Sequence, residues 1–200
     1  STNLYGLTLY LENFDYRFNP RKGYSILMEL ASGIKNISVN PNINSSLYEG
    51  IDLKSNQLES RFIGKIFIPI IGNLICKVEN NTGYIQNDHL FKNELFQIGG
   101  LKFLRGFDEK SLFASAYSVF SVEPRFIFEQ NSCLFAFLDY GFYEERLNQY
   151  TRDNPLGIGI GLDFDTNAGI FTIIYAIGKQ FDNSFDFQAA KIHFGYLNRF

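Results

Sequence analysis

The stretch Leu156-Gly-Ile-Gly-Ile-Gly-Leu-Asp-Phe-Asp165 alternates strictly between large apolar residues and glycine or aspartate. Because successive side chains of a β-strand point to opposite faces, this pattern predicts a strand with one apolar and one polar face. Its length of about ten residues is that of a strand that crosses a membrane. Glycine at every second position of the polar face indicates that something bulky packs against that face.

The same alternation recurs through most of the chain. In each such segment one face carries mainly Leu, Ile, Phe and Tyr, and charged side chains of both signs collect on the opposite face. Helical spacing fits none of the segments better than a period of two does. The segments cover residues 24–31, 61–70, 74–79, 120–128, 134–143, 171–177 and 192–200.

Short and long connections alternate between these segments. Tight turns rich in turn-forming residues are predicted at 19–23, 71–73, 129–132 and 165–169. Longer polar loops are predicted over 36–56, 86–114, 144–154 and 179–189. Short turns on one side and long loops on the other are typical of an outer-membrane barrel. A soluble sandwich or lipocalin-like barrel also alternates, and the sequence does not say which face is inside.

Composition narrows the class of protein. The chain has 18 Lys and Arg against 21 Asp and Glu, a formal net charge of -3, so it lacks the basic field of a nucleic-acid-binding protein. No stretch approaches the roughly 18 consecutive apolar residues of a membrane-spanning helix. Aromatic residues make up 17% of the chain, more than a soluble core of this size usually needs. We therefore predict an antiparallel transmembrane β-barrel of about eight strands, with residues 1–200 as one domain.

The sequence offers no pattern for chemistry on a substrate. It contains no nucleophile–base constellation, nucleophile elbow or phosphate loop, so we predict no enzymatic activity and no cofactor. His193 has no second His or Cys at ligand spacing, which favours a lining residue over a metal ligand. Cys76 and Cys133 fall on opposite faces, which cannot bring their Cα atoms within the roughly 7 Å that a disulfide requires. We predict two free thiols.

The longest predicted loop contains the segment Gly99-Gly-Leu-Lys-Phe-Leu-Arg-Gly-Phe107. It resembles the BamA/TamA/TpsB superfamily of outer-membrane assembly and secretion barrels. In those proteins a Gly-Gly pair and a Val/Leu-Arg-Gly-Phe/Tyr tetrapeptide lie in a long extracellular loop that folds back into the lumen. The matching residues here are Gly99, Gly100, Leu104, Arg105, Gly106 and Phe107.

Further segments resemble the same superfamily in its own order. They are the turn at 15–23, the acid Glu123, the run Phe137-Leu-Asp-Tyr-Gly141 and the hairpin 157–176. The chain also ends on an aromatic residue, which resembles the assembly signal of outer-membrane barrels and assigns Gly195 and Phe200 to it. Asn198 departs from the aromatic or aliphatic residue usual two places before the end.

The resemblance gives Arg105 a role that physical chemistry supports. A guanidinium in a partly desolvated lumen must pair with acceptors or stay hydrated. By parity, Asp139 and Glu123 lie on the lumen face of adjacent strands, so we expect Arg105 to pair with Asp139 and hold the loop inside. Gly106 would permit the tight turn that aims Arg105 inward, and Phe107 would wedge the loop tip against the wall.

The number of strands leaves the architecture open. Superfamily members usually have sixteen strands and periplasmic domains, whereas these segments match about eight or nine strands of the carboxy-terminal half. Residues 1–18 slip in phase, because Leu7, Leu9 and Leu11 share a face that Phe14 does not. They are therefore expected to form a bulged, lumen-plugging or edge segment, and a full strand there would make the total odd. The alternatives are an autonomous eight-stranded barrel, two chains pairing through exposed edges as a homodimer, or a fragment of a sixteen-stranded parent.

The resemblance also implies a location and partners. It places the chain in the bacterial outer membrane, assisting the insertion of other outer-membrane proteins or the movement of lipid through a weak seam between its first and last strands. Its partners would be outer-membrane lipids and client outer-membrane proteins. The alternatives are a structural or ligand-binding surface barrel with long outside loops, or a small channel. A lumen of eight strands is normally filled by side chains, which disfavours a wide protein-conducting pore.

Overall fold

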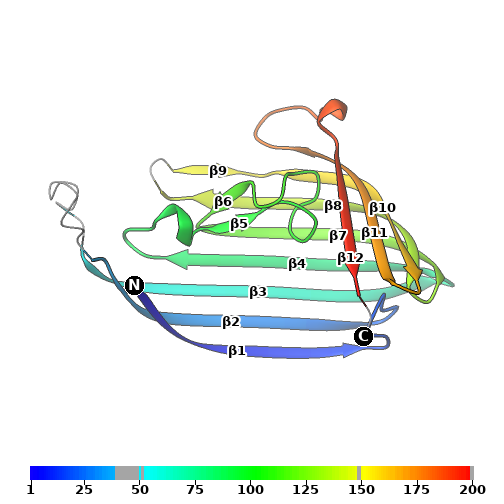
Figure 1. Cartoon of the computed structure of the whole chain (residues 1–200), viewed down its shortest axis with the longest axis horizontal. Coiled ribbons are helices and arrows are strands. Elements are labelled where there is room, and N and C mark those ends of the chain that lie inside the picture. The colour runs from blue at the N-terminus through cyan, green and yellow to red at the C-terminus, as the bar shows by residue number, and fades with distance from the viewer. Residues whose placement is uncertain (39–49, 51, 148–149, 199–200) are drawn as a thin grey trace.

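The computed structural model describes residues 1–38, 50, 52–147 and 150–198, and one long antiparallel sheet dominates them (Figure 1). The strands of its hydrogen-bonded path, in spatial order, are β1 (Thr2–Phe14), β2 (Gly23–Asn36), β3 (Lys54–Ile71), β4 (Leu74–Gln86), β7 (Ala116–Glu129), β8 (Ser132–Glu145), β10 (Leu156–Thr166), β11 (Gly169–Lys179) and β12 (Lys191–Leu197). A short strand, β9 (Thr151–Asp153), pairs with the end of β8. The predicted all-β antiparallel fold is confirmed.

The tight turns lie where the sequence predicts them. β3 ends at Ile71 and β4 begins at Leu74, around Gly72 with φ 56°. β7 and β8 are joined across 130–131, and β10 and β11 across 167–168. Between β1 and β2 the carboxylate of Asp15 accepts backbone N–H bonds from Arg21 at 2.9 Å and Lys22 at 3.2 Å, which fixes the first turn.

The two faces of the sheet differ as the alternation predicts. The sheet curls so that β10, β11 and β12 turn back over one face (Figure 1). That concave face carries the buried polar and charged side chains. The opposite, convex face exposes large apolar side chains along nearly every strand. Among them are Leu7, Leu9, Met28, Leu30, Ile66, Ile68, Phe120, Phe126, Leu138, Ile160, Tyr175 and Phe194. An exposed apolar surface on this scale marks a face that contacts lipid or another apolar partner.

The sheet is open, which differs from the expected closed barrel of eight strands. The ten-stranded sheet includes β9 off the main path, which leaves nine strands in the path, with β1 and β12 at its ends. Within the described residues no ladder joins these two edge strands. Because every neighbouring pair is antiparallel and the number of strands is odd, β1 and β12 run in the same direction.

The first strand is more regular than the bulged segment expected for residues 1–18. β1 pairs with β2 from Thr2 opposite Lys35 to Phe14 opposite Gly23 with no shift of register, so it contains no bulge. Phe14 keeps the parity of the strand and points to the concave side, where its ring meets that of Phe67 edge-on at 5.4 Å. The apparent slip in phase at Phe14 is therefore an inward-pointing side chain at the end of a regular strand, and the expected bulge is absent from β1. The position of β1 at the edge of the sheet is the edge arrangement named among the alternatives.

The longest predicted loop has secondary structure of its own. It contains a 3-10 turn, η2 (Lys92–Glu94), and a small two-stranded sheet of β5 (Phe96–Ile98) and β6 (Leu112–Ala114). The small sheet packs into a core cluster whose members are Ile85, Phe96, Ile98, Leu104, Phe107, Leu112, Ala114, Tyr117, Val119 and Tyr143. A second 3-10 turn, η3 (Phe187–Ala189), precedes β12. Among the described residues no helix is both long enough and apolar enough to cross a membrane.

Candidate functional site

The segment between β5 and β6, residues 99–111, lies inside the curl of the sheet, and we call it the tucked loop (Figure 1). Its backbone turns at Gly99 and Gly100, with φ of 107° and 89°, values that favour glycine. The Gly100 N–H donates to the carbonyl of Leu104 at 3.0 Å, closing a tight turn ahead of Arg105. The loop therefore presents Arg105 to the concave wall.

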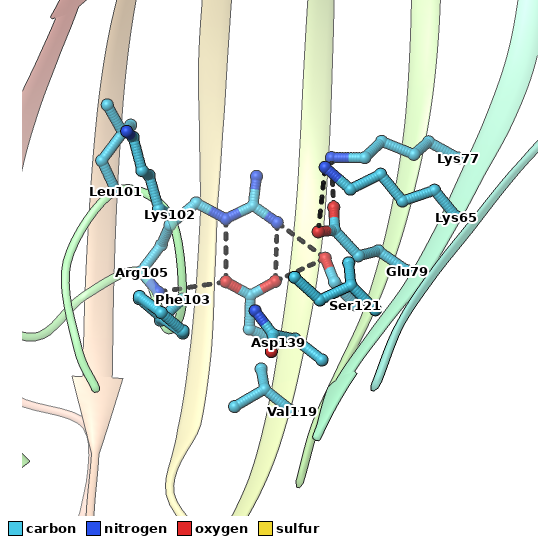
Figure 2. Close-up of a pocket in the computed structure, with 12 residues that line it drawn as sticks. Lys65, Lys77, Glu79, Leu101, Lys102, Phe103, Arg105, Val119, Ser121 and Asp139 are labelled. Atoms are coloured by element: carbon cyan, nitrogen blue, oxygen red, sulfur yellow. Dashed lines mark hydrogen bonds and ion pairs between the residues drawn. The ribbon is translucent and has the colours of Figure 1, made fainter. Parts of the chain in front are cut away.

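Arg105 reaches side chains from two neighbouring strands (Figure 2). Its Nε donates to Asp139 Oδ2 at 2.8 Å and its Nη2 to Asp139 Oδ1 at 2.6 Å, a bidentate pair with β8. The Arg105 backbone N–H also donates to Asp139 Oδ2 at 3.1 Å. On β7, Nη1 pairs with Glu123, and Nη2 donates to Ser121 Oγ at 2.8 Å. The structure thus brings together the arginine and both acids that the sequence singles out.

The charges of this site are removed from solvent. Arg105 is 7% exposed, Glu123 2% and Asp139 1%. Burial lowers the pKa of the Arg105 guanidinium, but its bond to Asp139 and the charge of Glu123 outweigh that effect and hold the pKa above its ordinary value. Charge-assisted bidentate bonds are among the strongest polar contacts in proteins. The Arg105 guanidinium therefore fixes the tucked loop to the concave wall through Asp139 and Glu123, and we call these three residues the clamp.

An aromatic ring completes the seat of the guanidinium. The Arg105 Cζ lies 3.6 Å from the centre of the Phe137 ring, a cation–π contact. Phe137 lies two residues before Asp139 on β8 and therefore on the same face, a signal from which the sequence could have placed it. Ser121, for which the sequence likewise predicts no role at Arg105, is two residues before Glu123 on β7 and donates to Asp139 Oδ1 at 2.6 Å.

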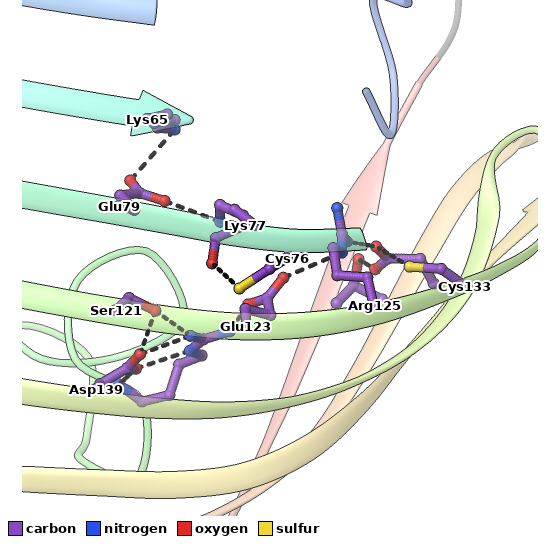
Figure 3. A network of polar contacts seen from close by, with 12 residues as sticks. Lys65, Cys76, Lys77, Glu79, Ser121, Glu123, Arg125, Cys133 and Asp139 are labelled. Atoms are coloured by element: carbon purple, nitrogen blue, oxygen red, sulfur yellow. Dashed lines mark hydrogen bonds and ion pairs between the residues drawn. The ribbon is translucent and has the colours of Figure 1, made fainter. Parts of the chain in front are cut away.

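The clamp continues into a chain of alternating charges across the wall (Figure 3). Glu123 Oε1 pairs with Arg125 Nε at 3.1 Å, and Arg125 Nη2 pairs with Asp163 Oδ2 of β10 at 2.5 Å. The Thr172 hydroxyl of β11 then donates to Asp163 Oδ1 at 2.6 Å. These contacts link β7, β10 and β11, so the concave wall behind the loop is cross-braced by ion pairs.

Bulky groups pack against the glycines on the polar face of β10, as the sequence predicts. A Cβ on Gly157 would lie 2.1 Å from the carbonyl oxygen of Arg105, so the loop backbone rests directly on this strand. A Cβ on Gly161 would lie 2.3 Å from the Phe135 ring. The absence of side chains at these positions thus leaves room for the tucked loop and for rings from β8.

The other residues of the motif anchor the loop. Leu104 and Phe107 are buried in the core cluster that includes Tyr117 and Tyr143. A Cβ on Gly106, whose φ is 90°, would lie 2.6 Å from the carbonyl carbon of Ile177 on β11. Of the residues expected to carry the assembly signal, Gly195 lies on β12 and Phe200 lies outside the described residues.

A cavity of about 410 Å³ lies between the tucked loop and β3, β4 and β7. On its far wall Glu79 pairs with Lys65 at 3.3 Å and with Lys77 at 2.8 Å (Figure 2). Nowhere in the described part of the chain do three His, Cys, Asp or Glu side chains gather in a way that could hold a metal ion. The site therefore consists of ion-paired side chains around a cavity.

Comparison with known proteins agrees with this arrangement. Residues 1–200 match the family described as the Omp85 superfamily domain. The chain belongs to the Omp85 superfamily. Members of this superfamily are outer-membrane proteins, and the all-β structure of this Omp85 domain, apolar on its convex face, is consistent with that setting. No curated protein matches the chain at a significant level.

Both thiols of the Omp85 domain are free in the structure. Cys133 is buried on the concave side, with Sγ 3.4 Å from Asp163 Oδ2, while Cys76 lies half-buried on the other face. We expect intact-mass measurement after alkylation in denaturant without reductant to show two adducts. Native alkylation should modify Cys133 far more slowly than Cys76, because reagents reach a buried thiol poorly. A mass two hydrogens lower with no adduct would contradict this expectation.

Proposed function

We propose that this Omp85 domain is an integral protein of the bacterial outer membrane that assists the insertion of other outer-membrane β-proteins. The observation that carries the proposal is the pair of open edges, β1 and β12. An unpaired strand edge presents a row of free backbone N–H and C=O groups. In hydrocarbon such groups carry a cost of several kcal/mol each until a partner satisfies them, so an edge in lipid is a template for an incoming strand.

The direction of the edge strands favours a partner of another sequence. Direct pairing of β1 with β12 would form a parallel ladder, which is slightly less stable per residue than an antiparallel one. It could extend over only the length of β12, Lys191–Leu197, against Thr2–Phe14 in β1. A second copy in the same membrane orientation again offers parallel edges, since rotation about the membrane normal preserves strand direction. An antiparallel neighbour for β1 would therefore come from a client strand, which makes a homodimer the weaker proposal.

The clamp also supports this reading, because it stiffens one side of the sheet and leaves the other free. The contacts of Arg105 and the ion pairs behind it join β7, β8, β10 and β11. β1 in contrast is exposed along both faces over most of its length, and among the strands that the structure describes it pairs with β2 alone. A braced half can hold the fold while the β1 side accepts a strand.

The proposal can be tested by reconstitution. The protein is placed in liposomes of phosphatidylethanolamine and phosphatidylglycerol, and a urea-unfolded outer-membrane barrel is added as client. We expect folding of the client, followed by its altered gel mobility, to be faster than in empty liposomes or in liposomes with an unrelated barrel of similar size. Scrambling of fluorescent lipid without client folding would favour lipid movement, conductance alone a channel, and inert bilayers a structural or ligand-binding surface protein.

Two proline variants test whether the activity depends on the free edge of β1. The N–H groups of consecutive strand residues point to opposite sides, so one of Thr8→Pro and Leu9→Pro removes a bond to β2 and the other removes an N–H from the free edge. We expect the free-edge variant to fold and yet to slow client insertion. A folded free-edge variant with undiminished activity would count against the proposal.

A further inference from the structure

The inner face of β12 rests on the tucked loop. β12 pairs with β11 from Lys191 opposite Ala176 to Leu197 opposite Ile170. Its residues 191, 193 and 195 share the concave face by strand parity. Each of these positions contacts a different part of the tucked loop, so the loop supports this edge strand along its length.

The three contacts differ in kind. Lys191 Nζ pairs with Asp108 Oδ1 at 2.8 Å. His193 Nε2 accepts the backbone N–H of Gly106 at 3.2 Å. At position 195 a Cβ would lie 3.0 Å from Leu101 Cδ2, so glycine leaves the space that Leu101 approaches.

The bond to His193 bears directly on Arg105, because it fixes the next peptide group. The Arg105 N–H donates to Asp139 at 3.1 Å, and the Arg105 carbonyl packs against Gly157. The Gly106 N–H belongs to the same peptide group as that carbonyl, and His193 is its acceptor. If this bond breaks, the peptide group is free to rotate and to lift the Arg105 carbonyl off β10.

We infer that His193 is a positioning residue for Arg105, and that with the Lys191–Asp108 pair it forms an acid-sensitive latch between the tucked loop and β12. The inference concerns the residues that hold the loop, and it does not rest on the proposed function. It differs from the lining role that the sequence predicts for His193.

The chemistry of imidazole makes the latch sensitive to protons. To accept from Gly106, Nε2 must carry a lone pair, so His193 is neutral with its proton on Nδ1. Protonation turns both nitrogens into donors and sets a donor against the Gly106 N–H. Histidine titrates near pH 6.5 in its ordinary state, so mild acidification favours the released form of the latch, in which His193 no longer accepts the Gly106 N–H and can take up a proton.

Charges of both signs face this histidine. From the tucked loop they are Arg105, Asp108 and Glu109, and from its own strand Lys191, while its partner across the ladder on β11 is the uncharged Ile174. Arg105 is already bound to Asp139 and Glu123, and Asp108 to Lys191. Glu109 Oε1 accepts the Leu101 N–H at 2.8 Å. The nearby acids thus have partners of their own before His193 becomes charged.

Amide hydrogen exchange at Gly106 tests the latch. The protection factor of this amide, corrected for intrinsic exchange, is measured by NMR of the full chain in detergent micelles at about pH 7.5 and about pH 5.5. We expect about a tenfold loss of protection on acidification of the wild type. His193→Gln offers an amide oxygen that does not titrate, so its protection should be equal at both pH values. His193→Ala should give low protection at both.

The other histidine provides the matched control. His89 lies outside the tucked loop, and its backbone carbonyl accepts from Lys35. His89→Gln should keep the full acid response of the wild type. A wild type whose Gly106 protection does not change with pH, or a response that persists in His193→Gln, would overturn the latch. If His193→Ala does not fold, the comparison of wild type, His193→Gln and His89→Gln still decides the question.

Discussion

Replacing Arg105 by alanine is expected to lower the free energy of unfolding by about 3–5 kcal/mol, the usual cost of breaking a buried ion pair from one side. The change leaves Asp139, 1% exposed, without the bidentate partner that compensates its burial, and it removes one of the partners of Glu123. The measurement is equilibrium unfolding in detergent with denaturant. Limited proteolysis of residues 99–111 should show at the same time that the tucked loop has left the concave face.

Two further variants serve as comparisons for Arg105→Ala. Arg105→Lys keeps the charge but loses the planar fork that matches a carboxylate, so its cost should be intermediate. Arg146 pairs with Glu144 at 2.8 Å with a side chain that is 51% exposed, and Arg146→Ala should cost less than about 1 kcal/mol. Equal losses for Arg105→Ala and Arg146→Ala would mean that the clamp carries no special share of the stability.

The second large effect is expected from Gly157→Ala. The added Cβ would lie 2.1 Å from the Arg105 carbonyl oxygen, which is backbone and cannot rotate away as a side-chain end can. Either β10 or the tucked loop must move, and overpacking of this kind typically costs about 1–3 kcal/mol. We expect the loop to yield, so that amides of residues 104–107 lose exchange protection while those of β10 and β11 keep theirs.

Gly64→Ala is the matched control for that clash. A Cβ at Gly64 would lie 2.9 Å from the far end of the Phe62 ring, which is a side chain and can shift. Its effect on the tucked loop should be absent and its effect on stability small. Unchanged protection of residues 104–107 in Gly157→Ala would show that the loop does not depend on contact with the bare face of β10.

The Arg105 site was accessible from the sequence because its parts are local patterns. The Leu104–Phe107 tetrapeptide stands in one loop, and the parity of β7 and β8 puts Glu123 and Asp139 on the concave face. Phe137 follows from the same parity two residues from Asp139. The ion pair of Arg125 with Asp163 does not follow from parity, because it depends on the order of β7, β8 and β10 in the sheet and on their register.

The sequence alone determined the alternation of faces, the positions of the tight turns and the candidate motif, because each depends on residues a few places apart. Tertiary structure decided the open sheet, the regular pairing of β1, the small β5–β6 sheet and the acceptor role of His193. The bond from Gly106 to His193 joins residues 87 positions apart, and no local spacing encodes such a contact. It exists because the curl of the sheet brings β12 back over the tucked loop.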